Sequence, residues 1–125
     1  MALKDIKILI VDDELFFRRV LRDMLEKMGF TVVAEAVDGE EAVEKFRLHR
    51  PHVTIMDIYL PEKNGIEATK EILAVDKNAK VLVCTASGND RDTQAALDIG
   101  ATAAVLKPFV AKEVYDSIKK VLTGK

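Results

Sequence analysis

Four short apolar runs in this chain each lead into a residue that can handle phosphate or a divalent cation. Asp12 and Asp13 follow the first run, Asp57 follows the second, Thr85 the third and Lys107 the fourth. In open α/β sheets, ligands bind in the crevice outside the carboxyl ends of the strands. The sequence therefore predicts that these side chains converge on one site, although they lie far apart along the chain.

The three carboxylates predict a metal site. Two like charges about 4 Å apart repel by roughly 4 kcal/mol at an effective dielectric near 20, so a cluster of acids needs a cation. Oxygen ligands without His or Cys favour a hard ion, and Mg²⁺ prefers a few carboxylates plus retained waters. We expect Asp12, Asp13 and Asp57 to bind Mg²⁺. The alternative for Asp12 and Asp13 is capping of the next helix, a position that Asp favours.

Asp57 is the candidate nucleophile, because a carboxylate held beside a metal can attack phosphorus and form an aspartyl phosphate. Such transfer depends on positioning and charge neutralisation, for which Lys107 offers an ammonium and Thr85 a hydroxyl. Pro108 restricts the backbone of Lys107 and is able to form a cis bond that aims its side chain. The alternatives are a turn-starting Asp57, a solvated Lys107 and a Thr85 that only ends a strand.

The elements that must position these groups follow from periodicity. Short β-branched runs alternate with longer helical patterns, which is typical of βαβ units and a mostly parallel sheet. Strands are predicted at residues 6–11, 31–36, 53–56, 80–84 and 103–106. The first helix should bury a stripe of large apolar residues: Phe16, Phe17, Val20, Leu21, Met24, Leu25 and Met28. The last should bury Val110, Val114, Ile118, Val121 and Leu122. The fourth, at about 90–99, has few large apolar residues, so we expect it to be the least firmly docked.

Size and composition exclude several classes of protein. A chain of 125 residues fits one domain, 1–125, and a net charge of -2 with dispersed Lys and Arg argues against nucleic-acid binding. Without a long apolar stretch or a signal-peptide core we expect no membrane insertion and a cytoplasmic location. Cys84 should be a buried, inert thiol, and His49 and His52 lack the neighbours of a metal site.

Five motifs in combination give the chain a specific resemblance. They are Ile10-Val11-Asp12-Asp13-Glu14, Ile55-Met56-Asp57 with Pro61, Asn64-Gly65, Thr85-Ala86, and Lys107-Pro108-Phe109. Across essentially its whole length the chain resembles a receiver domain of two-component response regulators, in particular the stand-alone chemotaxis (CheY-like) type. The resemblance implies a flavodoxin-like α/β fold: a doubly wound, five-stranded parallel sheet of order 2-1-3-4-5 with helices on both faces and no output domain.

The resemblance also implies roles for individual residues. Asp57 would accept a phosphoryl group from the phosphohistidine of a sensor histidine kinase, while Asp12, Asp13 and the main-chain carbonyl of Tyr59 would complete the Mg²⁺ ligands. Thr85 and Lys107 would bind the phosphoryl group. The chain would then be a signalling domain rather than an enzyme, although it would assist its own phosphorylation and slow autodephosphorylation.

One position departs from the family pattern. Receivers usually carry an aromatic rotamer switch three residues before the lysine, and that residue here is Ala104. An alanine has no rotamers to change, so the response must use displacement of loops and helices. Tyr59 and Ser87 occupy positions that tune phosphoryl lifetime in this family, and Phe109 is expected to pack as core.

The partners remain alternatives. As a monomer, the chain would act in chemotaxis on a flagellar motor component or a phosphatase. Its other possible roles are a phosphorelay intermediate or a phosphate sink that passes phosphate to a histidine phosphotransfer domain. Less favoured are a protein-binding module that is not phosphorylated, a haloacid-dehalogenase-type phosphatase, which would attack from the first strand, and a flavodoxin-like electron carrier, whose first loop should be glycine-rich rather than acidic.

Overall fold

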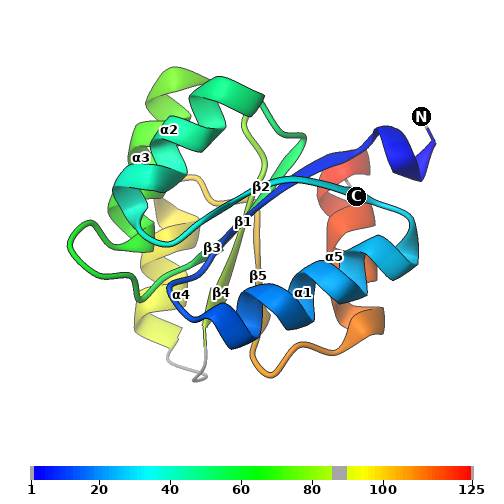
Figure 1. Ribbon diagram of the computed structural model, residues 1–125. Helices are drawn as coiled ribbons and strands as arrows, with labels where there is room; N and C mark the ends of the chain where they lie inside the picture. The colour runs from blue at the N-terminus through cyan, green and yellow to red at the C-terminus, as the bar shows by residue number, and fades with distance from the viewer. Residues whose placement is uncertain (1, 86–89, 125) are drawn as a thin grey trace.

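The computed structural model describes residues 2–85 and 90–124, and its centre is one parallel sheet. The strand order is β2-β1-β3-β4-β5, as predicted (Figure 1). The strands are β1 (Lys7–Val11), β2 (Thr31–Ala36), β3 (Val53–Asp57), β4 (Val81–Thr85) and β5 (Ala103–Leu106). Two of them match the predicted bounds, β1 and β3 differ by one residue at one end, and β4 is shifted by one residue at both ends.

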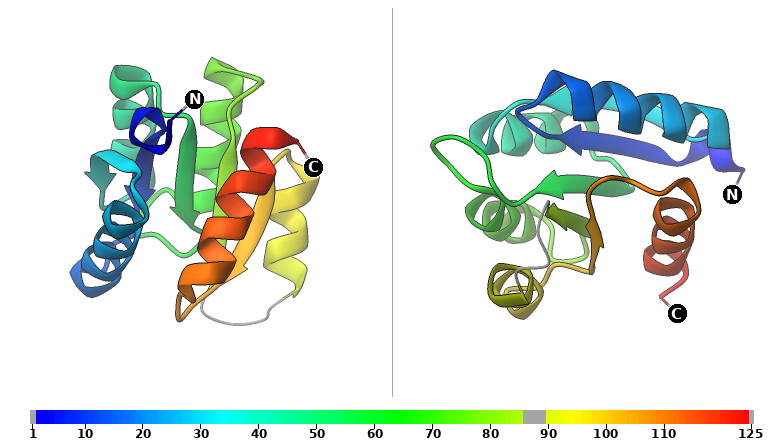
Figure 2. Two further views of the ribbon diagram at one scale, coloured as in Figure 1. Left: turned by 90° about the vertical axis from the view of Figure 1, so that its right-hand side faces the viewer. Right: turned by 90° about the horizontal axis from the view of Figure 1, so that it is seen from below.

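Helices cover both faces of the sheet. They are η1 (Leu3–Asp5), α1 (Leu15–Met28), α2 (Gly39–His49), α3 (Gly65–Val75), α4 (Asp90–Asp98) and α5 (Ala111–Thr123). Figure 2 shows α1 and α5 on one face, with α2, α3 and α4 on the other. This arrangement confirms the doubly wound α/β fold. Among the described residues, no helix is both long enough and apolar enough to cross a membrane.

The core consists of two apolar clusters, one on each face of the sheet. Along β1, Ile8 and Ile10 belong to the cluster under α1 and α5, whereas Leu9 and Val11 belong to the cluster under α2, α3 and α4. Parallel strands buried on both faces read as continuous hydrophobic runs. This burial explains why the central strands were visible as apolar runs in the sequence.

The register of the sheet brings the strand ends together. Val11 pairs with Met56, Asp57 pairs with Cys84, and Thr85 pairs with Leu106. The residues that follow Val11 and Leu106 therefore emerge at the same edge as Asp57 and Thr85. The predicted convergence is a consequence of parallel pairing with nearly matched strand ends.

Some predicted core positions are wrong. Phe16 is 68% exposed, because it lies in the first turn of α1 beyond the edge of the sheet. Val110 is 50% exposed and precedes α5 as its N-cap, so it is not part of the buried helix face. Phe109 does pack against the core, as expected.

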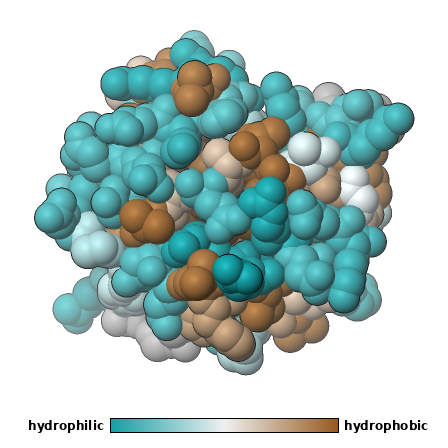
Figure 3. All heavy atoms as spheres, viewed as in Figure 1, coloured by the Kyte–Doolittle hydropathy of each residue, from teal (hydrophilic) through white to brown (hydrophobic). Residues whose placement is uncertain are grey.

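The fourth helix, α4, buries few residues, in line with the small number of large apolar residues in its sequence. Ala96 is the fully buried residue of α4 among those whose burial is described. Ala96 and the partly buried Leu97 remove little apolar surface from water, so helix docking here rests on a small area. The face of the molecule drawn in Figure 3 is largely hydrophilic, with hydrophobic residues in several spots.

Candidate functional site

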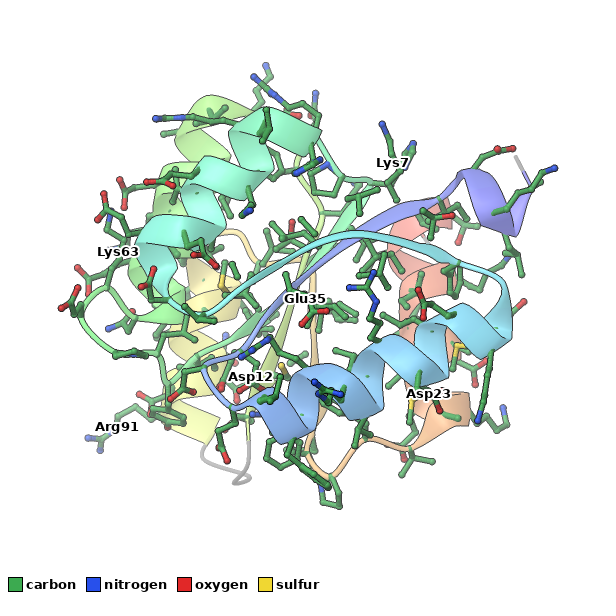
Figure 4. All side chains as sticks on the ribbon, in the orientation of Figure 1. Lys7, Asp12, Asp23, Glu35, Lys63 and Arg91 are labelled. Atoms are coloured by element: carbon green, nitrogen blue, oxygen red, sulfur yellow. The ribbon has the colours of Figure 1, made fainter. Side chains whose placement is uncertain are left out.

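Three carboxylates meet at the carboxyl edge of the sheet. Asp12, Asp13 and Asp57 each offer one oxygen, and these oxygens lie within 4.8 Å of one another. Asp12 and Asp57 are buried, whereas Asp13 is exposed. In Figure 4, Asp12 lies beside the first turn of α1, where β1 ends. The predicted acid cluster is therefore present, and one of its members faces water.

Lys107 reaches this cluster from the far strand. Its Nζ lies 3.1 Å from Oδ2 of Asp57 and 2.6 Å from Oδ2 of Asp12. The same ammonium lies 4.3 Å from the ring centroid of Phe17, a cation–π contact. The side chain is 5% exposed, so Lys107 is not a solvated loop residue. Its backbone N–H donates to the carbonyl of Thr85 at 2.9 Å, which aligns it with the end of β4.

The peptide bond between Lys107 and Pro108 is cis, as the sequence allowed. Phe17 packs edge-on against Phe109, with 6.1 Å between ring centroids. The apolar stripe of α1 predicted Phe17 as core but gave no sign that its ring lies against the lysine.

Burial and charge act against each other in the site. Burial raises the pKa of Asp57, and the ammonium of Lys107 opposes this shift without cancelling it. Burial works to lower the pKa of Lys107, but the ion pairs with Asp12 and Asp57 outweigh it and the pKa lies above its ordinary value. Burial also raises the pKa of the Cys84 thiol, and the nearby charge of Asp57 adds to the effect. The predicted inert thiol is consistent with this environment.

Thr85 and Tyr59 border the cluster. Thr85 ends β4 as a buried residue, one position beyond the partner of Asp57 in β3. The backbone N–H of Tyr59 donates to Oδ1 of Asp57 at 3.1 Å, and its hydroxyl donates to Asp92 in α4. Ala86 and Ser87, which belong to the predicted motif and its surroundings, lie outside the described residues.

The capping alternative does not account for the acids. The N-cap of α1 is Glu14, and no side chain caps that position. Oδ1 of Asp12 accepts from the backbone N–H of Glu14 at 2.9 Å. Oδ2 of Asp12 is buried and, despite its short distance to Lys107, has no hydrogen bond of suitable geometry among the described residues. An anionic oxygen in this condition, beside two further carboxylates, fits a divalent cation bound through oxygen.

Gly65 allows α3 to approach the site, a role that its place in a loop motif did not reveal. Its N–H donates to the carbonyl of Ile58 at 2.8 Å, and a Cβ on Gly65 would lie 2.1 Å from the carbonyl oxygen of Asp57. Any side chain there would push α3 away from β3. Asn64 caps the helix by accepting from the N–H of Glu67 at 2.9 Å.

His52 is placed by a structural contact. Its Nδ1 accepts from the backbone N–H of Lys7 at 2.9 Å, and it is not one of the residues of the acid cluster. This contact gives His52 a structural role between β1 and the start of β3.

Comparison with known proteins identifies the family. The family model for the response regulator receiver domain matches residues 8–119. The chain belongs to this family. The receiver is 44% identical to the chemotaxis protein CheY of Thermotoga maritima, over 92% of this chain and 96% of that protein. It is 45% identical to CheY of Bacillus subtilis, over 93% and 97% respectively.

Solved structures agree with this assignment. The receiver is similar to the response regulator domain of Thermotoga maritima CheB, at 35% identity and a TM-score of 0.89, covering 94% of this chain and 96% of that one. It is also similar to a chain of the CheX–CheY–BeF3–Mg²⁺ complex from Borrelia burgdorferi, at 32% identity and a TM-score of 0.88, covering 92% and 87%. The protein is a CheY-like receiver domain, which is a phosphorylation-activated signalling switch.

Proposed function

We propose that Asp57 is the phosphoacceptor and that residues 1–125 act as a single receiver domain in chemotaxis-type signalling. The observation that carries this proposal is the meeting of three carboxylate oxygens within 4.8 Å, with the ammonium of Lys107 3.1 Å from Asp57. A buried carboxylate beside a cation site and a lysine has the surroundings that an attacking group in phosphoryl transfer needs.

In the reaction, a carboxylate oxygen of Asp57 forms a bond to phosphorus while the P–N bond to the donor histidine breaks. The imidazole leaves with the electron pair of that bond and takes up a proton. Lys107 stays beside the reacting carboxylate and offsets the charge of the product, which adds roughly -1.5 to -2 to the site. Thr85, at the end of β4, offers a hydroxyl to a phosphoryl oxygen. Slow hydrolysis of the acyl phosphate by water would reset the switch.

The carboxylates of Asp12, Asp13 and Asp57 and the main-chain carbonyl of Tyr59 would hold Mg²⁺. The ion would neutralise charge on the phosphoryl oxygens and on the acids. The buried Oδ2 of Asp12, which has an ion-pair contact with Lys107 but no hydrogen bond of suitable geometry among the described residues, supports this assignment. The exposed Asp13 leaves the site open to water, and Mg²⁺ usually retains several waters.

The central test is labelling by acetyl phosphate. The unmodified chain should form an acid-labile phosphoprotein with Mg²⁺ and almost none with EDTA, and Asp57→Asn should form none. Asp23→Asn is the matched control, because Asp23 is 66% exposed on α1 and pairs only with Lys27 in the described contacts. Full labelling of Asp57→Asn would remove Asp57 from the role of phosphoacceptor.

We expect Lys107 to matter more for the conformational response to phosphorylation than for the transfer of the phosphoryl group to Asp57. Lys107→Ala removes the ammonium that joins the acid cluster to β5, so labelling should persist while the change on the output face is blunted. The measurement is partner affinity before and after phosphorylation. A full gain of affinity in Lys107→Ala would show that another group carries the signal.

The route from Asp57 to the output face must differ from the usual one, because Ala104 has no side chain to rotate. We propose that Tyr59 contributes to this route, since its N–H contacts Asp57 and its hydroxyl contacts Asp92 in α4. Phosphorylation would then displace the loop after β3 and, with it, a helix that rests on a small apolar area.

The proposal also covers the kinase that donates the phosphoryl group and the partner that receives the signal. A sensor histidine kinase is the donor, and a motor component or phosphatase is the first choice of partner, with a histidine phosphotransfer domain as the alternative; Ala104 weighs slightly against the first choice. Protein loaded with beryllofluoride and Mg²⁺ should retain the partner, and Asp57→Asn should not. Recovery of a phosphotransfer domain instead of a motor component or phosphatase would identify a relay or sink. Cytoplasmic location and a monomeric state stay predictions.

A further inference from the structure

The side chain of Arg18 joins α1 to the loop that carries the acid pair. Its Nη1 donates to the backbone carbonyl of Asp12 at 2.9 Å, and its Nε donates to Oε1 of Glu35 in β2 at 3.0 Å. The side chain is only 13% exposed. One guanidinium therefore connects the first helix, the edge strand and the acid cluster.

Glu35 anchors this guanidinium. Its second oxygen, Oε2, accepts from Nη1 of Arg22 at 2.5 Å, so both carboxylate oxygens have an arginine partner. Glu35 pairs with Ile10 in the sheet, which places it close to the end of β1. In Figure 4, Glu35 lies where β2 passes the first turns of α1, near Asp12. Because the guanidinium is planar and rigid, the contact of its Nε with Glu35 restricts the direction in which its Nη1 donates to Asp12.

The backbone of Asp12 is held on both sides. Its N–H donates to the carbonyl of Ala36 in β2 at 3.1 Å, and its carbonyl accepts from Arg18. These two bonds fix the peptide planes from which the Asp12 and Asp13 side chains project. The direction of both carboxylates therefore depends on Arg18.

We infer that Arg18, anchored by Glu35, is a positioning residue that holds the Asp12–Asp13 loop in the geometry required for Mg²⁺ binding. This inference rests on the proposed function. Groups that orient metal ligands without touching the metal typically change its affinity by 10–100-fold when they are removed. Arg18 contacts the carbonyl of a proposed ligand, which is the position such a group occupies.

Charge and positioning make opposite predictions. Removal of Arg18 deletes a positive charge near a cation site, which by electrostatics alone would strengthen Mg²⁺ binding. Loss of positioning weakens it. The sign of the change in affinity therefore separates the two explanations.

The experiment is a calorimetric titration of the metal-free chain with Mg²⁺. Arg18→Ala should bind about tenfold more weakly than the unmodified chain. Arg18→Lys keeps the charge but lacks the planar fork that reaches two acceptors, so it should also bind more weakly. The matched control is Arg22→Ala, which cuts the other contact to Glu35; its Mg²⁺ affinity should stay within about twofold. Urea unfolding of the variants measures their loss of stability separately.

Mg²⁺ affinity that is unchanged or stronger in Arg18→Ala would overturn the inference, as would equal weakening in Arg22→Ala. If Arg18→Ala does not fold, Arg18→Lys decides by the same criterion. An unmodified chain that binds no Mg²⁺ would overturn the proposed function together with this inference. Binding by the unmodified chain with the same affinity in Arg18→Ala would overturn the inference alone.

Discussion

Asp57 should destabilise the metal-free fold. At an effective dielectric of about 20, carboxylate oxygens within 4.8 Å of Asp57 repel it by about 3.5 kcal/mol each, whereas Lys107 Nζ at 3.1 Å attracts it by about 5.4 kcal/mol. Burial of Asp57 is the largest cost, and the repulsion by the two acids offsets much of the attraction of the lysine, so the carboxylate is destabilised overall. Asp57→Asn should therefore raise the free energy of unfolding by about 1 to 2 kcal/mol without metal, once solvent screening at the exposed Asp13 is allowed for.

Mg²⁺ should remove the difference in stability between Asp57→Asn and the unmodified chain. At a free concentration ten times its Kd, a ligand of the folded state adds about 1.4 kcal/mol of stability. The unmodified chain should gain this amount, and Asp57→Asn should gain much less because it lacks a ligand. The assay is thermal and urea unfolding with EDTA and with Mg²⁺. With EDTA, Asp57→Asn should melt about 3–8 °C higher than the unmodified chain.

The pH dependence has a defined sign. Burial raises the pKa of Asp57, so the folded state holds this proton more tightly than the unfolded chain does. Stability contributed by the protonated group is present at low pH and is lost as pH rises from the ordinary carboxyl range through the raised pKa. The advantage of Asp57→Asn should therefore grow across that interval and then level off.

Asp23→Asn is again the control. The exposed ion pair of Asp23 with Lys27 contributes little, so the free energy of unfolding should change by less than about 0.5 kcal/mol. A metal-free Asp57→Asn that is less stable than the unmodified chain would refute the repulsion argument. Equal stabilisation of both proteins by Mg²⁺ would refute the assignment of Asp57 as a ligand.

Two further substitutions and one labelling experiment test the packing around the site. Thr54→Val should raise the unfolding free energy by about 1 kcal/mol in urea titrations, because Oγ1 of the buried Thr54 has no hydrogen-bond partner among the described residues; a loss of stability would reveal a hidden partner. Gly65→Ala should cost about 3 kcal/mol and slow phosphorylation by acetyl phosphate, since its Cβ would meet the carbonyl of Asp57; normal rates would show that α3 can shift freely. Cys84, buried and with a raised pKa, should resist thiol reagents in the native protein and react fully in urea; rapid native labelling would contradict its burial.

Much of the fold could be predicted from the sequence because it depends on local patterns. Continuous apolar runs marked strands buried on both faces, and helical periodicity marked the segments between them. Predictions failed where a pattern continued past the edge of the core. Phe16 and Val110 keep helical spacing, but they lie at helix starts that extend beyond the sheet and face water.

The amino-acid sequence alone determined which groups stand at the strand ends: three acids, a hydroxyl and a lysine. Tertiary structure decided how they meet, including the contact of Lys107 with Asp57 and its packing on Phe17. It also decided the hydrogen bond from Arg18 to the Asp12 carbonyl and the close approach of α3 to β3 at Gly65. Periodicity reports the conformation and buried face of one segment, whereas contacts between segments depend on strand register and helix placement, which are settled only when the whole core packs.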